Sequence, residues 1–164
     1  MNDRCDASQS QLARVRDSFA LQGAMRTVGA SLLEVAPGAV DIGFLWDGAL
    51  TQHNGYVHAG MLATVMDSAC GYAALSVMPL SHGVLSVEFK INLLARAQGP
   101  HFRCEGRVIK TGRTIVVAEG KAWGWDIEGR EKLIATMGCT LMAVAEERTA
   151  AVSLGGEHHQ HPTP

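Results

Sequence analysis

One apolar segment, residues 59–78, constrains the fold more than any other feature of the chain. The segment has the length of a long helix, Pro79 follows it, and Asp67 is its only charged residue. A helix without a polar face must be surrounded on most sides. A membrane span would hold Asp67 at mid-bilayer at a cost of about 3 kcal/mol, with no second span to pair with it. We therefore predict a buried helix in the core of a folded domain.

The segments on both sides of this helix have the patterns of β-strands. Residues 31–46 form two short strands around the Pro37-Gly38 turn. Residues 82–97 alternate, which places four apolar side chains on one face: Val87, Phe89, Ile91 and Leu93. Three more strand segments follow, separated by glycine-containing loops at 98–100, 111–112 and 128–129. We predict an α+β fold in which a hairpin and a four-strand antiparallel meander form a curved sheet wrapped around one long central helix.

The length of 164 residues suits one domain with two extensions. Leu12, Val15 and Phe19 have the spacing of an amphipathic helix, so residues 1–29 are predicted as an N-terminal helical extension. The folded domain is expected at 30–146. Residues 147–164 are expected to form a flexible tail.

Composition and charge narrow the classes of function. The net charge is −2, whereas a nucleic-acid-binding protein normally carries a basic surplus. The four cysteines are far apart and the histidines lack ligand spacing, so we expect reduced thiols, no metal and no cofactor. The N-terminus is polar where a signal peptide would be apolar. These features predict a cytoplasmic protein that binds neither nucleic acid nor membrane.

The carboxylate of Asp67 has two readings. No Lys or Arg lies three or four residues from it along the helix, so no ion pair on the same helix compensates its charge. Asp67 is therefore either a structural acid, satisfied by a hydrogen bond to a neighbour or lying on a small exposed patch, or a general base or nucleophile. The spacing alone leaves both readings open.

The start of the helix, His58-Ala59-Gly60, is a second candidate site. The first backbone N–H groups of a helix lack intrahelical partners and lie at its positive end, where they can hold a developing oxyanion. A plain tight turn is the alternative reading. Ala59 and Asp67 are 67 − 59 = 8 residues apart, about 12 Å along a helix, so one chain cannot bring both to one reacting atom. Two antiparallel copies can, and a site of this kind would require at least a dimer.

The order of Gln52, His58, Ala59, Gly60 and Asp67 resembles the hotdog-fold acyl-CoA thioesterases, in the branch that contains the phenylacetate-degradation thioesterase. The family's motif is His-Gly-Gly followed by a helix that carries Asp or Glu. The segments "SVEFKINLLARAQG" and "GRTIVVAEGKAWGWDIEGREKLIATMGCTLM" resemble the family's later strands. The likeness covers roughly residues 31–144. Ala59 replaces the middle glycine of the motif, and Arg96 replaces a proline that is usual in the family.

The resemblance implies a hotdog fold, a homo-oligomer with a dimer as functional unit, a tetramer as its assembly, and acyl-CoA as substrate. It implies that Asp67 activates water or attacks the thioester, and that the Ala59 N–H polarises the carbonyl. Gln52 would orient water or substrate, and Asn54 is the alternative polar residue in the same loop. Ser86 would hydrogen-bond the carboxylate or water. His58 would fix the loop and Gln52, and the small Gly60 beside Ala59 would let the carbonyl approach.

The sequence says less about which residues would bind the coenzyme A phosphates and the far end of the acyl group. Arg107, Lys110 and Arg113 lie in or beside a turn where they could meet the phosphates of coenzyme A, although a solvated turn explains them equally well. Met66 and Tyr72 are candidates for the far end of the acyl groove. The alternative function is a non-catalytic acyl-CoA- or lipid-binding hotdog module. A hotdog dehydratase would need an Asp-His pair in one loop or a helical His, and neither pattern is found.

Overall fold

The computed structural model describes residues 3–145, with side chains from residue 9 onward, so the predicted tail at 147–164 lies outside the described residues. Six antiparallel strands form one sheet in the order β1-β2-β4-β5-β6-β3. The helices are α1 (Asp3–Leu21), α2 (Gly23–Val28), the short 3-10 helix η1 (Gly48–Leu50) and α3 (Ala59–Leu75). The strands are β1 (Ser31–Ala36), β2 (Ala39–Leu45), β3 (His82–Leu93), β4 (His101–Thr111), β5 (Ile115–Trp125) and β6 (Glu131–Ala145).

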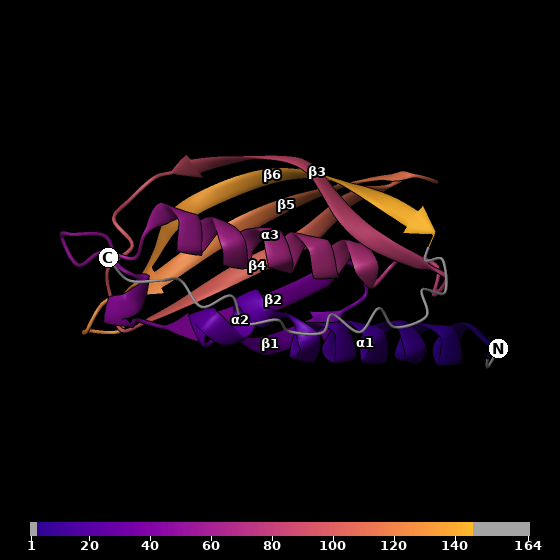
Figure 1. The fold of residues 1–164 in the computed structure, drawn as a ribbon, viewed down its shortest axis with the longest axis horizontal. Helices are drawn as coiled ribbons and strands as arrows, with labels where there is room; N and C mark the ends of the chain where they lie inside the picture. Colours follow the sequence, from indigo (N-terminus) through magenta and orange to yellow (C-terminus); the bar gives the residue numbers. More distant parts are fainter. Residues whose placement is uncertain (1–2, 146–164) are drawn as a thin grey trace, which may run out of the picture.

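The sheet curves around α3, as predicted (Figure 1). The residues of β5 alternate strictly between exposed and buried from Ile115 to Ala122, because one face of the strand meets the helix and the other meets solvent. The helix supplies much of the core, including Leu62, Val65 and Met66, none of which is more than 1% exposed. The arrangement is an α+β single domain with a hotdog architecture.

A glycine in β4 fixes how closely α3 lies on the sheet. A Cβ atom at Gly106 would lie 2.2 Å from the carbonyl oxygen of Ala69, far inside van der Waals contact. Only a glycine therefore lets the helix backbone rest directly on this strand. The contact is two residues from Asp67, so it also determines where the middle of the helix lies.

Two predictions about element boundaries and strand order are wrong. The helix ends at Leu75 rather than Met78, because Ser76 Oγ donates to the Ala73 carbonyl at 2.7 Å and accepts from the Gly38 N–H at 2.7 Å. The last four strands are not a meander, since β3 pairs with β6 and β2 pairs with β4.

The loop at 98–100 is consequently not a hairpin turn. The Leu94 and Ala95 N–H groups both donate to the Ile134 carbonyl, and the Val57 N–H donates to the Ala97 carbonyl. The chain after β3 therefore crosses the end of the sheet before it enters β4. The register of β3 also shifts between Ser86 and Glu88, which leaves Val87 in a bulge rather than in the regular alternation.

The predicted N-terminal helix is present, followed by the short helix α2. Val15 of α1 is fully buried, and Met25 and Val28 of α2 join the same core. Phe19 packs against the ring of Tyr72 on α3, with ring centroids 5.9 Å apart. No helix within residues 3–145 combines the length and apolar character needed to span a membrane.

Candidate active site

Asp67 lies in the middle of α3, where two strands supply it with neutral hydrogen-bond donors. Ser86 Oγ of β3 donates to Asp67 Oδ1 at 2.7 Å. Cys139 Sγ of β6 lies 3.8 Å from the same oxygen and donates to it. No ion pair of Asp67 occurs within residues 9–145. The carboxylate is thus held through one oxygen, and the other oxygen, Oδ2, has no hydrogen-bond partner among the described side chains.

Two of the buried thiols, those of Cys70 and Cys104, are not nucleophiles. A hydrogen bond with Cys139, together with burial, raises the pKa of Cys70 far above its usual range. Burial likewise raises the pKa of Cys104. Since a thiolate is the reactive form, these cysteines stay protonated and inert at neutral pH.

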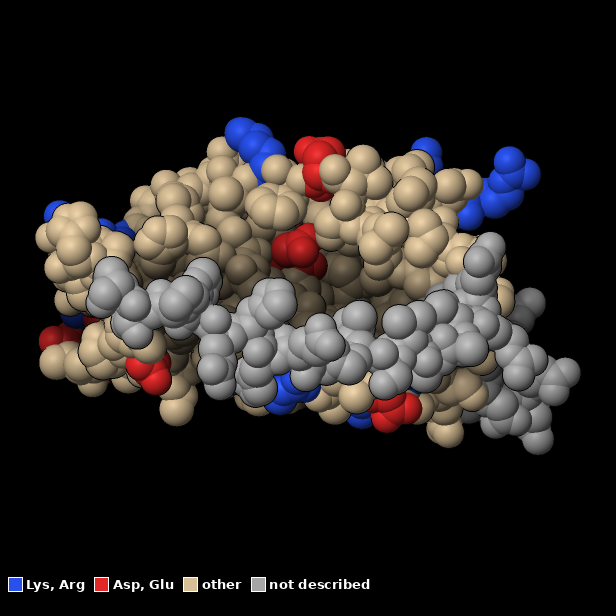
Figure 2. All heavy atoms as spheres, viewed as in Figure 1, with Lys and Arg blue, Asp and Glu red and all other residues tan. Residues whose placement is uncertain are grey.

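A cavity of about 210 Å³ opens beside Asp67. Figure 2 shows an acidic side chain in a hollow of the face that α3 presents. The cavity is lined by residues of α3, β3 and the α1–α2 junction: Gln22, Asp67, Ser68, Gly71, Tyr72, Val84 and Ser86. Tyr72, one of the two residues considered for the acyl groove, lies in this wall, whereas Met66 is buried in the core.

Gln22 is a wall residue that the sequence did not single out. Its side chain donates to Ser68 Oγ at 3.3 Å and accepts from the Tyr72 hydroxyl at 3.0 Å. Its only signal in the sequence is its position before Gly23, where the helical pattern breaks. Ser68 and Cys139 were also missed, because each reads as an ordinary small core residue.

The start of α3 presents one free backbone donor. The His58 ring caps the helix, since its Nδ1 accepts from the Gly60 N–H at 2.9 Å. The Gly60 N–H is therefore occupied and does not face a ligand. No acceptor for the Ala59 N–H occurs among residues 3–145, and Ala59 is exposed. Of the two N–H groups, only that of Ala59 is available for an oxyanion.

His58 and Gly60 together shape this turn. A Cβ atom at Gly60 would lie 3.1 Å from His58 Nδ1, so the glycine leaves room for the capping ring. The His58 N–H donates to the Leu50 carbonyl at 2.8 Å, which ties the loop to the helix start. No hydrogen bond joins His58 and Gln52 in the described part of the chain, so His58 fixes the loop without fixing Gln52.

Gln52 belongs to the loop rather than to the cavity at Asp67. Its Oε1 accepts from the Asn54 N–H, and its backbone N–H donates to the Tyr56 carbonyl at 2.9 Å. Gln52 and Ala59 lie in the loop before α3 and at the first residue of α3, whereas Asp67 lies in the middle of α3, next to Ser86 of β3. Within one chain the structure brings Asp67 and Ser86 together and leaves Gln52, His58, Ala59 and Gly60 as a second group.

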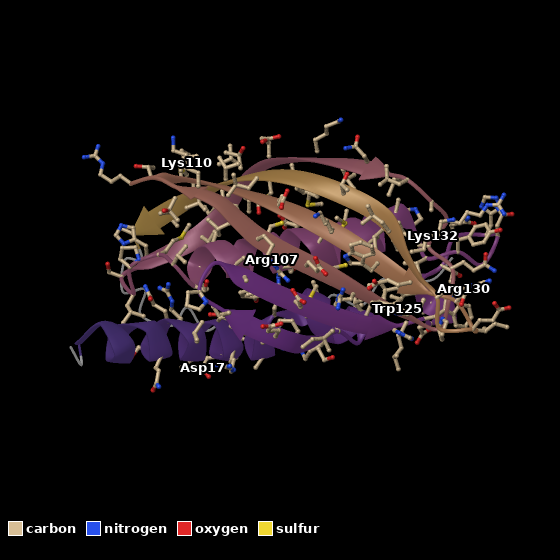
Figure 3. The ribbon with its side chains drawn as sticks, turned by 180° about the vertical axis from the view of Figure 1, so that it is seen from behind. Asp17, Arg107, Lys110, Trp125, Arg130 and Lys132 are labelled. Carbon is tan, nitrogen blue, oxygen red and sulfur yellow. The ribbon has the colours of Figure 1, made fainter. Side chains whose placement is uncertain are left out.

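The three predicted phosphate ligands are not equivalent. Arg107 forms an ion pair with the buried Asp41 at 2.5 Å, and this contact raises the pKa of the guanidinium group. The guanidinium group of Arg107 is therefore already paired within the sheet and is not free to bind a phosphate. Lys110 and Arg113 are exposed and form no ion pair with a described side chain. Figure 3 shows Lys110 at one end of the sheet, opposite the end that carries Arg130 and Lys132.

A second cavity of about 1270 Å³ lies at the end of the sheet that carries Arg130 and Lys132. It borders Gly55 in the loop before α3 and Arg96 after β3, but it does not include Asp67. Arg130 is paired with Asp126 at 2.7 Å and with Glu128 at 2.9 Å. No group of three His, Cys, Asp or Glu side chains suited to a metal occurs among the described residues.

Comparisons with known proteins agree with the architecture. The sequence profile of the thioesterase superfamily matches residues 54–128. A thioesterase family protein from Silicibacter pomeroyi is 47% identical, with a TM-score of 0.81 over 83% of this chain and 99% of that one. The E. coli PaaI protein from the phenylacetic acid degradation operon shares the fold, with 13% identity and a TM-score of 0.74 over 85% of this chain and 96% of that one.

A sequence relative points to the same class of protein. A protein of Halobacterium salinarum, provisionally named an esterase, is 28% identical over 102 residues, which span 59% of this chain and 67% of the relative. The match to the Silicibacter pomeroyi protein extends over nearly the whole of that protein. The chain therefore belongs to the thioesterase superfamily of hotdog-fold hydrolases.

Proposed function

We propose that the protein is an acyl-CoA thioesterase that hydrolyses a thioester to a carboxylic acid and free coenzyme A. The observation that carries the proposal is the arrangement around Asp67. One carboxylate oxygen is fixed by Ser86 at 2.7 Å, and a cavity opens beside the residue. The backbone N–H of the partner subunit's Ala59, at the start of its α3, supplies the matching oxyanion donor.

The two halves of the site come from two subunits. Ala59 and Asp67 are about 12 Å apart along one helix, whereas the reacting carbon needs both within about 3 Å. A twofold axis that reverses α3 brings the start of one helix to the middle of its partner. Asp67 and Ser86 of one subunit would then face the partner's Ala59, with the partner's Gln52 at its rim to orient water or substrate.

Strand β3 is the edge through which the dimer forms. It is an edge strand of twelve residues, and Leu85, Val87 and Leu93 on it are each 54–55% exposed. An exposed, long and apolar edge strand pairs with another strand. The opposite edge, β1, lies against α1. Antiparallel pairing of two β3 strands about a twofold axis makes one continuous sheet and also reverses the two α3 helices. A tetramer would form by packing of two such dimers.

The chemistry uses the free oxygen of Asp67. Oδ2 either removes a proton from an attacking water or attacks the thioester carbonyl to give an anhydride that water then opens. In both routes a C–O bond forms, the C–S bond breaks, and the thiolate of coenzyme A leaves and takes up a proton. The Ala59 N–H stabilises the negative charge on the carbonyl oxygen. Coenzyme A takes part as a portion of the substrate, and the steps above use only protein groups and water.

Lys110 and Arg113 are our candidates for the phosphates of coenzyme A. Lys110 lies at the end of the sheet opposite Arg130 and Lys132, and Arg113 follows it in the turn between β4 and β5. The large cavity at the other end of the sheet borders the loop before α3. In an antiparallel dimer, the turn after Lys110 therefore lies at the same end as the partner's helix start. Arg107 is left out because Asp41 holds its guanidinium group.

Three buried free thiols, Cys70, Cys104 and Cys139, support a reducing compartment and hence the cytoplasm.

Thiol release from a panel of acyl-CoAs tests the proposal. We expect Asp67→Asn to lower kcat by about 10²–10⁴-fold, because the amide cannot act as base or nucleophile. The matched control is Asp17→Asn on α1, whose carboxylate is exposed and lies at the outer edge of the molecule (Figure 3). Equal rates for the wild type and Asp67→Asn would overturn the catalytic role. Retention of acyl-CoA without thiol release would instead indicate a binding module.

A further inference from the structure

The junction between α1 and α2 reaches the cavity at Asp67, although both helices precede the first strand of the sheet in the chain. Gln22 is the residue at this junction, with an extended backbone that interrupts the helix. Its side chain lines the cavity together with Asp67 and Ser86. A segment that precedes the hotdog domain thus supplies one wall of the cavity.

The helix α1 is held firmly enough to keep this wall in place. Arg14 donates from Nη2 to the Leu75 carbonyl at 2.8 Å and from Nη1 to the His82 carbonyl at 2.8 Å. These contacts place a positive charge at the C-terminal end of α3, where the helix dipole favours it. Phe19 packs on Tyr72 one turn before Gln22. The wall is therefore part of the packed structure rather than a loose segment.

The wall at Gln22 is polar. Gln22 bridges Ser68 Oγ and the Tyr72 hydroxyl, at 3.3 Å and 3.0 Å. After these two bonds, the Gln22 amide retains one N–H and the Tyr72 hydroxyl retains an acceptor site. An apolar chain end pressed against them would take these groups out of water without a partner, whereas a hydroxyl would satisfy them.

The dimensions limit the acyl group. Tyr72 follows Asp67 by 72 − 67 = 5 residues, about 7.5 Å along the helix. Five carbon–carbon bonds of about 1.5 Å span most of that distance, which is the length of a six-carbon acyl chain. At about 30 Å³ for each water-sized group, the cavity of about 210 Å³ holds about seven such groups. A longer chain would exceed this volume, and Gln22 lies in the wall of the same cavity.

We propose that Gln22 determines acyl specificity, so that the cavity takes a compact acyl group with a hydrogen-bonding substituent at its far end. The inference rests on the proposed thioesterase function. Gln22 acts as a specificity residue and takes no part in the chemical step.

The test compares hexanoyl-CoA, 6-hydroxyhexanoyl-CoA and dodecanoyl-CoA as substrates of the full chain. We expect kcat/KM for 6-hydroxyhexanoyl-CoA to exceed that for hexanoyl-CoA by about 10-fold, the value of one good neutral hydrogen bond, and dodecanoyl-CoA to be the poorest substrate. Gln22→Leu keeps the volume and removes the polar group, so the hydroxyhexanoyl preference should fall to about 1. Tyr72→Phe should reduce it in the same direction. Gln9→Leu, the same substitution at an exposed position of α1, should retain the preference.

The ratio of the two substrates separates specificity from stability, because a loosened helix α1 would lower both rates together. An unchanged ratio in Gln22→Leu and Tyr72→Phe, or equal rates with dodecanoyl-CoA, would overturn the inference and leave the thioesterase function intact. Absence of thiol release from every substrate would overturn the thioesterase function. If no thiol is released, calorimetry still tests the inference. The Kd values of hexanoyl-CoA and 6-hydroxyhexanoyl-CoA are then compared between Asp67→Asn and the double variant Asp67→Asn/Gln22→Leu, and only the first should prefer the hydroxylated ligand.

Discussion

The middle and the start of α3 carry the two halves of the proposed site, and they are built in different ways. The middle is supported by the sheet: Asp67 receives donors from β3 and β6, and Gly106 of β4 lets the helix rest on the sheet. The start is exposed: the His58 ring caps it, and the Ala59 N–H faces outward with no acceptor among the described residues.

This difference separates the two requirements of the site. A carboxylate needs a fixed position and a controlled environment, which packing inside the domain provides. An oxyanion donor must face an atom that belongs to another molecule, so it has to be left unsatisfied at a surface. One helix supplies both by using its middle for the first and its N-terminus for the second.

Removal of the Ala59 N–H tests the exposed half of the site and should have the largest effect of the variants below. Ala59→Pro deletes the donor at a first-turn position that tolerates proline, and the extended backbone of His58 suits a residue before proline. We expect kcat to fall by about 10²–10³-fold, with Tm within a few degrees of the wild type. Ala59→Gly, which keeps the N–H, is the matched variant and should retain most of the activity. Full activity in Ala59→Pro would show that this N–H is not the oxyanion donor.

Displacement of the helix tests the half of the site that the sheet supports. Gly106→Ala would place a methyl group 2.2 Å from the Ala69 carbonyl oxygen, so either the helix or the strand must move. We expect a loss of about 1–3 kcal/mol in the free energy of unfolding, measured by chemical denaturation. Gly138→Ala in β6 is the control, because nothing lies within 4 Å of a Cβ atom there. Equal stability of the two variants would contradict the close approach of α3 and β4.

Loss of the Ser86 hydroxyl tests whether its hydrogen bond positions the Asp67 carboxylate for catalysis. Ser86→Ala removes the 2.7 Å hydrogen bond to Oδ1 and leaves the weaker Cys139 contact. We expect kcat to fall about 10-fold, since one hydrogen bond to a charged group is worth about 1.5 kcal/mol or more. Ser31→Ala, at an exposed position of β1, provides the control in the same thiol-release assay. An unchanged kcat in Ser86→Ala would mean that this bond does not position Asp67 for catalysis.

Loss of the cap is the smallest of these effects. His58→Ala leaves the Gly60 N–H without its acceptor, and we expect a cost of about 1 kcal/mol in stability. His58→Asn should recover most of the loss, because asparagine caps helices well. Thermal unfolding of the two variants measures the difference. If alanine and asparagine gave the same Tm, the His58 ring would not act as the cap.

Much of the fold and part of the site could be predicted from the sequence. The buried helix, the strand segments and the position of Asp67 follow from hydrophobic patterning, because one charge in an apolar helix stands out. The order of the strands could not be predicted in this way. The loop at 98–100 has the length of a hairpin loop. The residues before it instead form backbone hydrogen bonds with Ile134 and Val57, which carry the chain across the end of the sheet.

The residues missed at the site are those whose role depends on contacts distant in sequence. Gln22 meets Ser68 and Tyr72, 46 and 50 residues further along the chain, and no local pattern marks such a meeting. Arg107 and Lys110 lie close in sequence, which suggests a shared role. The structure separates them, since the pairing of β2 with β4 places Arg107 on Asp41.

Complementation between two inactive variants tests most directly whether the site is shared between two copies. Asp67→Asn and Ala59→Pro are unfolded, mixed in equal amounts and refolded together, and thiol release is measured. Half of the resulting dimers pair one variant with the other, and each of these contains one intact site, so we predict about a quarter of wild-type activity. Activity no higher than that of the separate variants would contradict a site formed by Asp67 of one subunit and the partner's Ala59.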